Sequence, residues 1–230
     1  MRRSFPAIVV LATFLLWPRP TTCRAGELEG VLRELGQCRE AIKSLHHNYT
    51  VSTGPRDAAT TIATETWELQ TDAGRKHVTM TREAAKRADR IVAVTKVVSD
   101  GTHEWREMPI GQTVLVVKSK QMPVEEFASL RRLLVEGKAR KRDSEVVAGE
   151  SCIVIECVGE HDGHTQKSTF WVSKKHGLIL RQLTESSDGQ RREMITTSLE
   201  INKTVDTKIF AYAPPEGARV IDTLDMKPPK

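Results

Sequence analysis

Apolar positions in residues 27–47 recur with the spacing of an α-helix. The members of this stripe are Leu28, Val31, Leu32, Leu35, Cys38, Ile42 and Leu45. Intervals of three and four residues place all of them on one helical face. The pattern therefore predicts an amphipathic helix that ends at Asn48, with His46 and His47 near its C-terminus, where a cation suits the helix dipole.

From residue 49 to residue 119 the pattern changes to alternation. Ala63, Trp67 and Leu69 stand among polar neighbours, as in a half-buried strand. Asp72-Ala73-Gly74 and Asp100-Gly101 are turn sequences that predict hairpins. Further strands are expected over residues 76–81, 90–99, 103–108 and 113–118.

The second half of the chain contains one more helical pattern and then strands again. Pro123 suits the first turn of a helix whose apolar stripe is Phe127, Leu130, Leu133 and Leu134. Extended segments are expected over residues 144–148, 151–158, 166–173, 178–185 and 191–202. Pro214-Pro215 is expected to close the folded part.

These elements predict a mainly β (α+β) fold with about eleven strands. Helices and strands do not alternate, which disfavours a parallel α/β sheet. No segment rich in Gly, Pro or Ser divides the chain, so a single antiparallel domain is expected. A sheet curved around two apolar helices can be filled by side chains or can leave an apolar cavity for a lipid chain. The pattern does not distinguish the two.

The N-terminal residues have the organisation of a secretory signal. Met1-Arg2-Arg3 precedes an uncharged apolar run from Phe5 to Trp17, and prolines and small residues follow. We expect residues 1–25 to be a signal peptide, residues 26–221 an exported, periplasmic domain without a transmembrane segment, and residues 222–230 a flexible tail. Lipid anchoring through Cys23 is an alternative, although Pro20 and Thr22 match a lipobox poorly.

Charge and motifs narrow the class of function. The net charge is +5, but the first 26 residues contain four arginines and no acid, which leaves 31 basic and 30 acidic residues after them. Nucleic acid is therefore not an expected partner. No hydrolase, metalloprotease, Walker or dinucleotide motif is present, so we expect no enzyme, no catalytic residue, no cofactor and no metal.

The cysteines and a basic segment allow further expectations. Cys152 and Cys157 lie five residues apart in a strand and so point to opposite faces, where they cannot pair with each other. Arg131, Arg132, Lys138 and Arg140 belong to a basic stretch that continues to Arg142. This stretch is either a solvated helix end and strand edge or a contact for an anionic lipid head group or protein partner.

Four segments resemble motifs of one protein superfamily. They are Ser44-Leu45-His46-His47-Asn48-Tyr49-Thr50, Asp100-Gly101-Thr102-His103-Glu104-Trp105, residues 170–181 (FWVSKKHGLILR) and residues 210–221 (FAYAPPEGARVI). Their order is similar to that of the LolA/LolB-type periplasmic lipoprotein carriers. The resemblance implies a half-open antiparallel β-barrel with helices packed against or into its concave face.

The resemblance also implies a function. In that superfamily the cavity takes lipoprotein acyl chains or other lipids. We expect an exported, non-enzymatic protein that binds a lipid or lipoprotein acyl chain, in envelope lipoprotein transport. The alternative is an envelope sensor or interaction domain with a filled core and a protein partner. Alternation places these residues on candidate cavity-facing positions: Trp67, Leu69, Met80, Trp105, Leu115, Val117 and Ile155.

Overall fold

The computed structural model describes residues 25–55, 59–72, 74–84, 91–110, 113–121, 127, 130–131, 138–161 and 163–224. The predicted signal peptide, most of the helix expected after Pro123 and the last six residues of the tail lie outside this part.

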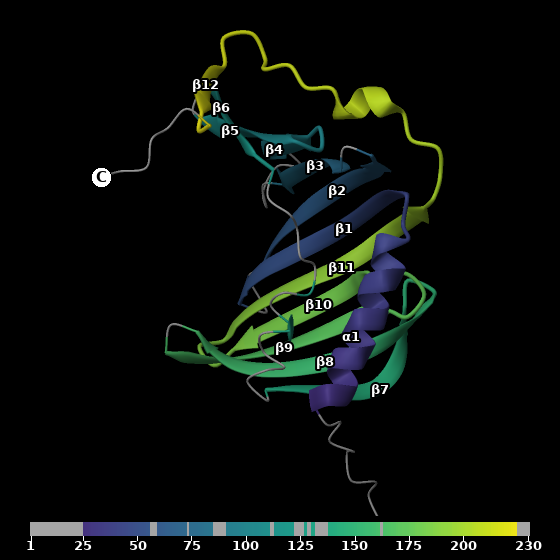
Figure 1. Cartoon of the computed structure of the whole chain (residues 1–230). Coiled ribbons are helices and arrows are strands. Elements are labelled where there is room, and N and C mark those ends of the chain that lie inside the picture. Colours follow the sequence, from purple (N-terminus) through teal and green to yellow (C-terminus); the bar gives the residue numbers. More distant parts are fainter. Residues whose placement is uncertain are drawn as a thin grey trace, which may run out of the picture.

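The described chain forms one large curved sheet. Its strands are β1 (Ser44–Pro55), β2 (Thr60–Thr71), β3 (Gly74–Ala84), β4 (Ile91–Ser99), β5 (His103–Ile110), β6 (Thr113–Lys120), β7 (Ala139–Val147), β8 (Glu150–His161), β9 (His164–Ser173), β10 (Ile179–Ser186), β11 (Gln190–Ile201) and β12 (Arg219–Asp222). Their order across the sheet is β12-β6-β5-β4-β3-β2-β1-β11-β10-β9-β8-β7. The sheet curls but does not close (Figure 1).

Two runs of consecutive hairpins build this sheet. Strands β1 to β6 form one run and β7 to β11 the other, and the antiparallel pairing of β1 with β11 joins them. Hairpin connections need only short turns, which is why Asp, Gly and Asn mark the strand ends so clearly in the sequence. The expected open antiparallel barrel is therefore confirmed.

The first helix is shorter than its apolar stripe suggests. Helix α1 spans Ala25–Glu40, and β1 begins at Ser44, so the prediction of helix for residues 41–47 is wrong. Leu45 fits both periods: it continues the helical stripe and also begins the alternation with His47, Tyr49 and Val51. These residues form a strand because β1 pairs with β2 on one side and with β11 on the other. The predicted helix-end position of the two histidines is wrong for the same reason.

Helix α1 packs on the concave face of the sheet (Figure 1). Its buried residues Leu28, Leu32 and Leu35 contact a cluster from β8 and β9 that includes Ile155 and Phe170. The expectation of a helix against the concave face is thus confirmed for α1. This end of the barrel is filled with apolar side chains.

After β11 the chain crosses the convex face as an extended segment, residues 203–217, which we call the C-terminal strap. It contains the short 3-10 helix η1 (Thr207–Phe210), and Phe210 is buried against Val78 and Val98. Strand β12 then pairs parallel with β6, where Lys118 and Asp222 form an ion pair of 2.9 Å. The folded part therefore continues beyond Pro215, contrary to prediction.

The described cysteines are all free thiols. Cys152 packs with Trp171 and Leu180, whereas Cys157 lies in the separate cluster under α1. The prediction that Cys152 and Cys157 do not pair is confirmed. Burial raises the pKa of Cys152 to about 11 and that of Cys157 to about 12, so both stay protonated and unreactive at neutral pH.

Candidate functional site

A cavity of about 810 Å³ opens on the concave face beside α1. Residues from α1, β1, β2, β3, β10 and β11 contribute to its walls. Because side chains alternate along a strand, every second residue of β1 to β3 faces it. In β2, for example, Thr66 and Glu68 line the cavity, while Trp67 between them points to the opposite face.

The lining is divided by chemistry. The apolar part consists of Leu45, Phe127, Leu178, Ile179 and Met194. The polar and charged part consists of Arg39, Glu40, His47, Tyr49, Thr66, Glu68, Arg75, His77, Thr79, Gln121, Arg131 and Gln182. An acyl-chain cavity lined by hydrocarbon alone would lack this second part. The lining is thus suited to a ligand with both an apolar and a polar portion.

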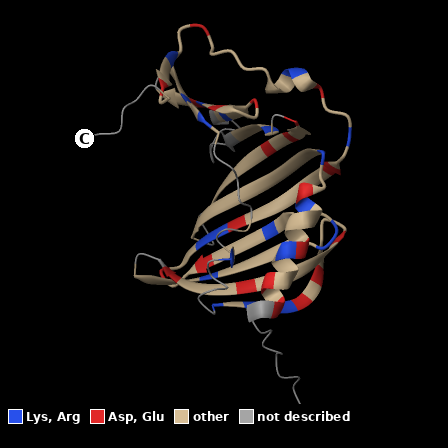
Figure 2. Ribbon diagram, in the orientation of Figure 1, with Lys and Arg blue, Asp and Glu red and all other residues tan. Residues whose placement is uncertain are grey.

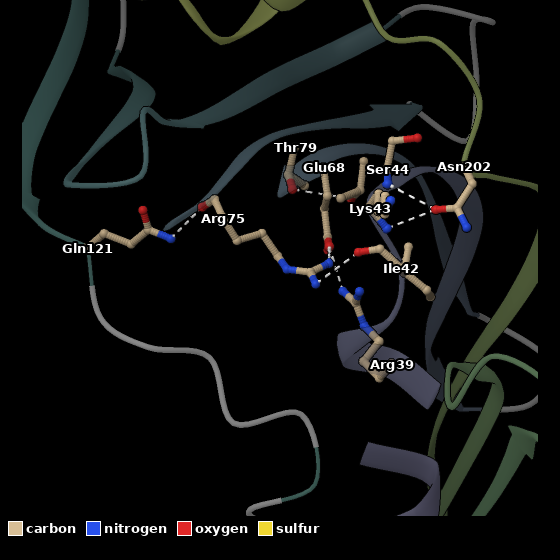
Figure 3. A network of polar contacts seen from close by, with 10 residues as sticks. Arg39, Ile42, Lys43, Ser44, Glu68, Arg75, Thr79, Gln121 and Asn202 are labelled. Atoms are coloured by element: carbon tan, nitrogen blue, oxygen red, sulfur yellow. Dashed lines mark hydrogen bonds and ion pairs between the residues drawn. The ribbon is translucent and has the colours of Figure 1, made fainter. Parts of the chain in front are cut away.

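An ion-pair network lies at the polar side of the cavity (Figure 3). The Glu68 carboxylate accepts hydrogen bonds from Arg39 at 2.5 Å and from Arg75 at 2.8 Å. Arg75 also donates to the Ile42 carbonyl at 3.2 Å, and Gln121 donates to the Arg75 carbonyl at 2.9 Å. Burial alone would raise the pKa of Glu68, but the two guanidinium groups outweigh it and hold that pKa below its usual value.

Two histidines in the lining are neutral at physiological pH. Burial lowers the pKa of His47 to about 4, although Glu68 opposes this change, and the ring contacts the Thr196 hydroxyl at 2.8 Å. Burial also lowers the pKa of His77 despite the nearby Glu104 carboxylate. Among the described residues of the lining, the charged side chains at neutral pH are therefore Arg39, Arg75 and Arg131 together with Glu40 and Glu68.

The structure does not bring the seven predicted cavity residues together. Trp67, Leu69 and Met80 pack on the convex face under the C-terminal strap, and the Trp105 ring lies 5.5 Å from that of Tyr212. The remaining three are Leu115 and Val117 in β6, beside β12, and Ile155 under α1. None of the seven lines the cavity on the concave face.

The predicted basic contact residues are also separated. Arg131 lines the cavity, whereas Arg140 in β7 pairs with the buried carboxylate of Glu156. Arg142 and Lys167 bind the same carboxylate. Lys138 immediately precedes β7, and Arg132 lies outside the described residues. Basic and acidic residues are interspersed over the sheet, as Figure 2 shows.

Sequence reasoning missed the charged residues of the cavity. Glu68, Arg75 and His77 lie around the hairpin that joins β2 and β3, on the strand faces opposite the apolar residues that alternation predicts to face the cavity. The signal that could have found them is the charge itself. Glu68 and Arg75 have opposite signs and share one face of a hairpin, which is typical of an ion pair across strands.

A curved open sheet with a helix and a cavity on its concave face defines the half-open β-barrel class of fold. The chain has the LolA-like fold of that class, as the sequence motifs indicate. It is similar to MucB, with a TM-score of 0.55, 15% identity, and coverage of 85% of this chain and 66% of MucB. It is also similar to the Pseudomonas aeruginosa MucA/MucB complex structure, with a TM-score of 0.51, 15% identity and coverage of 80% of this chain.

The chain spans 61% of the protein that it matches in the Pseudomonas aeruginosa complex. A weaker similarity, with a TM-score of 0.39, 15% identity and coverage of 79% of this chain and 94% of the other, is to an outer membrane lipoprotein-sorting protein domain from Vibrio parahaemolyticus. No protein-family model matches the sequence. No curated protein matches it either.

Two further observations concern membranes and metals. Within the described residues, no helix is both long and apolar enough to cross a membrane. In the same part of the chain, no group of three or more His, Cys, Asp or Glu side chains could hold a metal ion.

Proposed function

We propose that the protein is an exported, non-enzymatic binding protein that holds an amphiphile, a lipid or a lipoprotein acyl chain, in the concave cavity. The observation that carries this proposal is the divided lining, with Leu45, Leu178, Ile179 and Met194 in the same cavity as the arginine cluster. The LolA-like fold supports the same proposal. The cavity lies beside α1 on the concave face of the sheet, where the sequence resemblance implies a lipid-binding cavity.

The volume is compatible with such a ligand. A cavity of about 810 Å³ is within the roughly 300–1,000 Å³ of typical small-molecule pockets. Burial of an acyl chain contributes about 0.8 kcal/mol per methylene group. Several methylenes against the apolar part of the lining are therefore enough for measurable affinity.

The test uses two neighbouring residues of β11. Met194 lines the cavity, whereas Ile195 is 39% exposed on the opposite face of the strand. We expect a neutral hydrophobic fluorescent dye to bind the folded protein and to be displaced by lipids. Met194→Asp should weaken dye binding at least tenfold, because a carboxylate in the apolar part of the lining would lose hydration.

The matched control is Ile195→Asp, which adds the same charge one residue away and should leave dye binding unchanged. Circular dichroism of both variants checks that the sheet is intact. Equal loss in both variants, or no dye binding by folded wild-type protein, would contradict the proposal.

A second candidate function is an envelope interaction domain that binds another protein. The filled cluster under α1 favours it, because this end of the barrel has no room for a chain. The MucA/MucB complex shows a protein of this fold with a protein partner. Absence of dye and lipid binding in the experiment above would favour this second function.

A further inference from the structure

We propose that Phe127 and Ile179 form the inner wall of the concave cavity and that this wall limits the length of the acyl chain that the protein binds. The inference rests on the proposed function, because it names the chain-length class of amphiphile that the same cavity takes. It concerns the apolar part of the lining, where the cavity adjoins the filled cluster under α1.

Two residues belong both to the cavity and to the filled cluster. Among the described residues, Phe127 and Ile179 are the only members of the lining that also pack in the cluster under α1. Helix α1 lies over β8 and β9 at this end of the sheet (Figure 1). The boundary between open and filled space on the concave face therefore runs along these two side chains.

Behind this boundary the barrel is packed. Leu32 of α1 and Ile155 of β8 are fully buried in the cluster. Protein interiors of this kind are close-packed, with few voids larger than a water molecule. A chain that lies along the apolar lining would thus meet Phe127 or Ile179, and it could extend further only by displacing core side chains.

Phe127 is held firmly enough to act as a wall. Its side chain is only 3% exposed, and its carbonyl accepts a hydrogen bond of 2.8 Å from the Arg131 backbone, one helical turn later. Leu130 in the same turn is buried in the cluster. Pushing extra atoms into a packed core forces side chains off their preferred rotamers. We therefore expect a sharp limit to chain length.

The first experiment measures affinity against chain length. Straight-chain alkanoates from hexanoate to hexadecanoate displace the neutral dye from wild-type protein at pH 7.5, below the concentrations at which they form micelles. Each methylene that enters the apolar lining should tighten binding about fourfold, as the free energy of burying a methylene implies. We expect this increase to stop where the methyl end reaches the wall, so that longer chains bind no more tightly.

The second experiment removes the wall. Phe127→Ala opens the cavity toward the filled cluster. Alkanoates two carbons beyond the wild-type limit should then bind about tenfold more tightly to the variant than to wild type, whereas the shortest ones should bind equally. Ile179→Ala truncates the other wall residue, which is only partly buried, and should move the limit in the same direction. It decides the question if Phe127→Ala does not fold.

The matched control is Leu28→Ala. Leu28 is buried in the same cluster, about two helical turns before Gly36, where α1 first lines the cavity. This truncation should lower the free energy of unfolding but leave the chain-length limit where it is in wild type.

The outcomes separate this inference from the proposed function. A limit that moves in a wall variant and not in Leu28→Ala supports the inference. A limit that stays in place in every folded wall variant, or that moves equally in Leu28→Ala, overturns it. Affinity that rises through the whole series in wild type overturns the inference and leaves the proposed function standing. Failure of every alkanoate to displace the dye overturns both.

Discussion

At the scale of single residues, Gly177 lets the sheet approach α1. It has a φ of 62°, and a Cβ atom there would overlap the Leu35 carbonyl of α1. Glycine is therefore favoured at this position for two reasons: the backbone is left-handed, and there is no room for a Cβ atom beside α1. It lies just before β10 and brings the connection from β9 against the helix that borders the cavity.

We expect Gly177→Ala to lower the free energy of unfolding by about 3 kcal/mol or more, because strain and overlap add. Gly189→Ala is the matched control: its φ is 84°, but no atom lies near the new Cβ. That control should cost only about 1–2 kcal/mol. Chemical denaturation measures both, and equal losses would show that α1 is not held at this contact.

His47 connects the cavity to the pH dependence of stability. Its folded pKa of about 4 lies below the usual 6.5, so the unfolded state binds more protons between these values. The free energy of unfolding should therefore fall as the pH decreases from about 6.5 to about 4, by up to about 3 kcal/mol. His77, whose pKa is also lowered, acts in the same direction.

The contribution of His47 can be isolated by substitution. We expect His47→Gln to flatten the pH dependence of urea unfolding between pH 6.5 and 5, since glutamine keeps a polar contact for Thr196 but does not titrate. His164→Gln, at an exposed position in the β8–β9 hairpin, should leave the slope unchanged. An unchanged slope in His47→Gln would show that this histidine is protonated to the same extent in both states.

At the scale of elements, the C-terminal strap protects apolar surface on the convex face. Val205, Ile209, Phe210 and Tyr212 cover a patch that includes Trp67 and Trp105. Most other strap residues are exposed, so these four side chains hold it to the sheet. The strap also leads to β12, which covers the edge of β6 that would otherwise be open to another strand.

Phe210 is the most deeply buried side chain of this strap, at 2% exposure. We expect Phe210→Ala to lower the free energy of unfolding by about 3–5 kcal/mol and to shift tryptophan fluorescence to longer wavelength. Lys208→Ala in the same 3-10 helix is the exposed control and should change neither. A fluorescence spectrum identical to wild type in folded Phe210→Ala would mean that the strap stays in place without its anchor.

At the scale of the whole molecule, the two faces of the sheet have different roles. The concave face has α1 over the apolar cluster of β8 and β9 and the cavity beside β1 to β3. The convex face is covered in part by the strap and carries the Glu156 and Glu193 ion-pair networks. The proposed ligand site therefore lies on one face and most of the strap packing on the other.

The sequence by itself determined the class of fold, the hairpin turns and most of the strands. Local turn chemistry and period-two alternation depend only on near neighbours, so they can be interpreted without a structure. The motifs around residues 44–50 and 210–221 indicated the LolA-like fold, which the structure confirms. Asp100-Gly101, for example, separates β4 from β5, as its turn sequence predicts.

Only the tertiary structure decided which side of the sheet is the inside. Alternation places the side chains of Trp67 and Glu68 on opposite faces of the sheet, but it does not say which of the two faces the cavity. The strap covers the tryptophan side, and that contact spans more than 140 residues of sequence. The helix likewise ends at Glu40 because β11, 150 residues later, pairs with the residues that follow it. Long-range pairing of this kind leaves no local signal, so the cavity and its arginines could be found only in the folded chain.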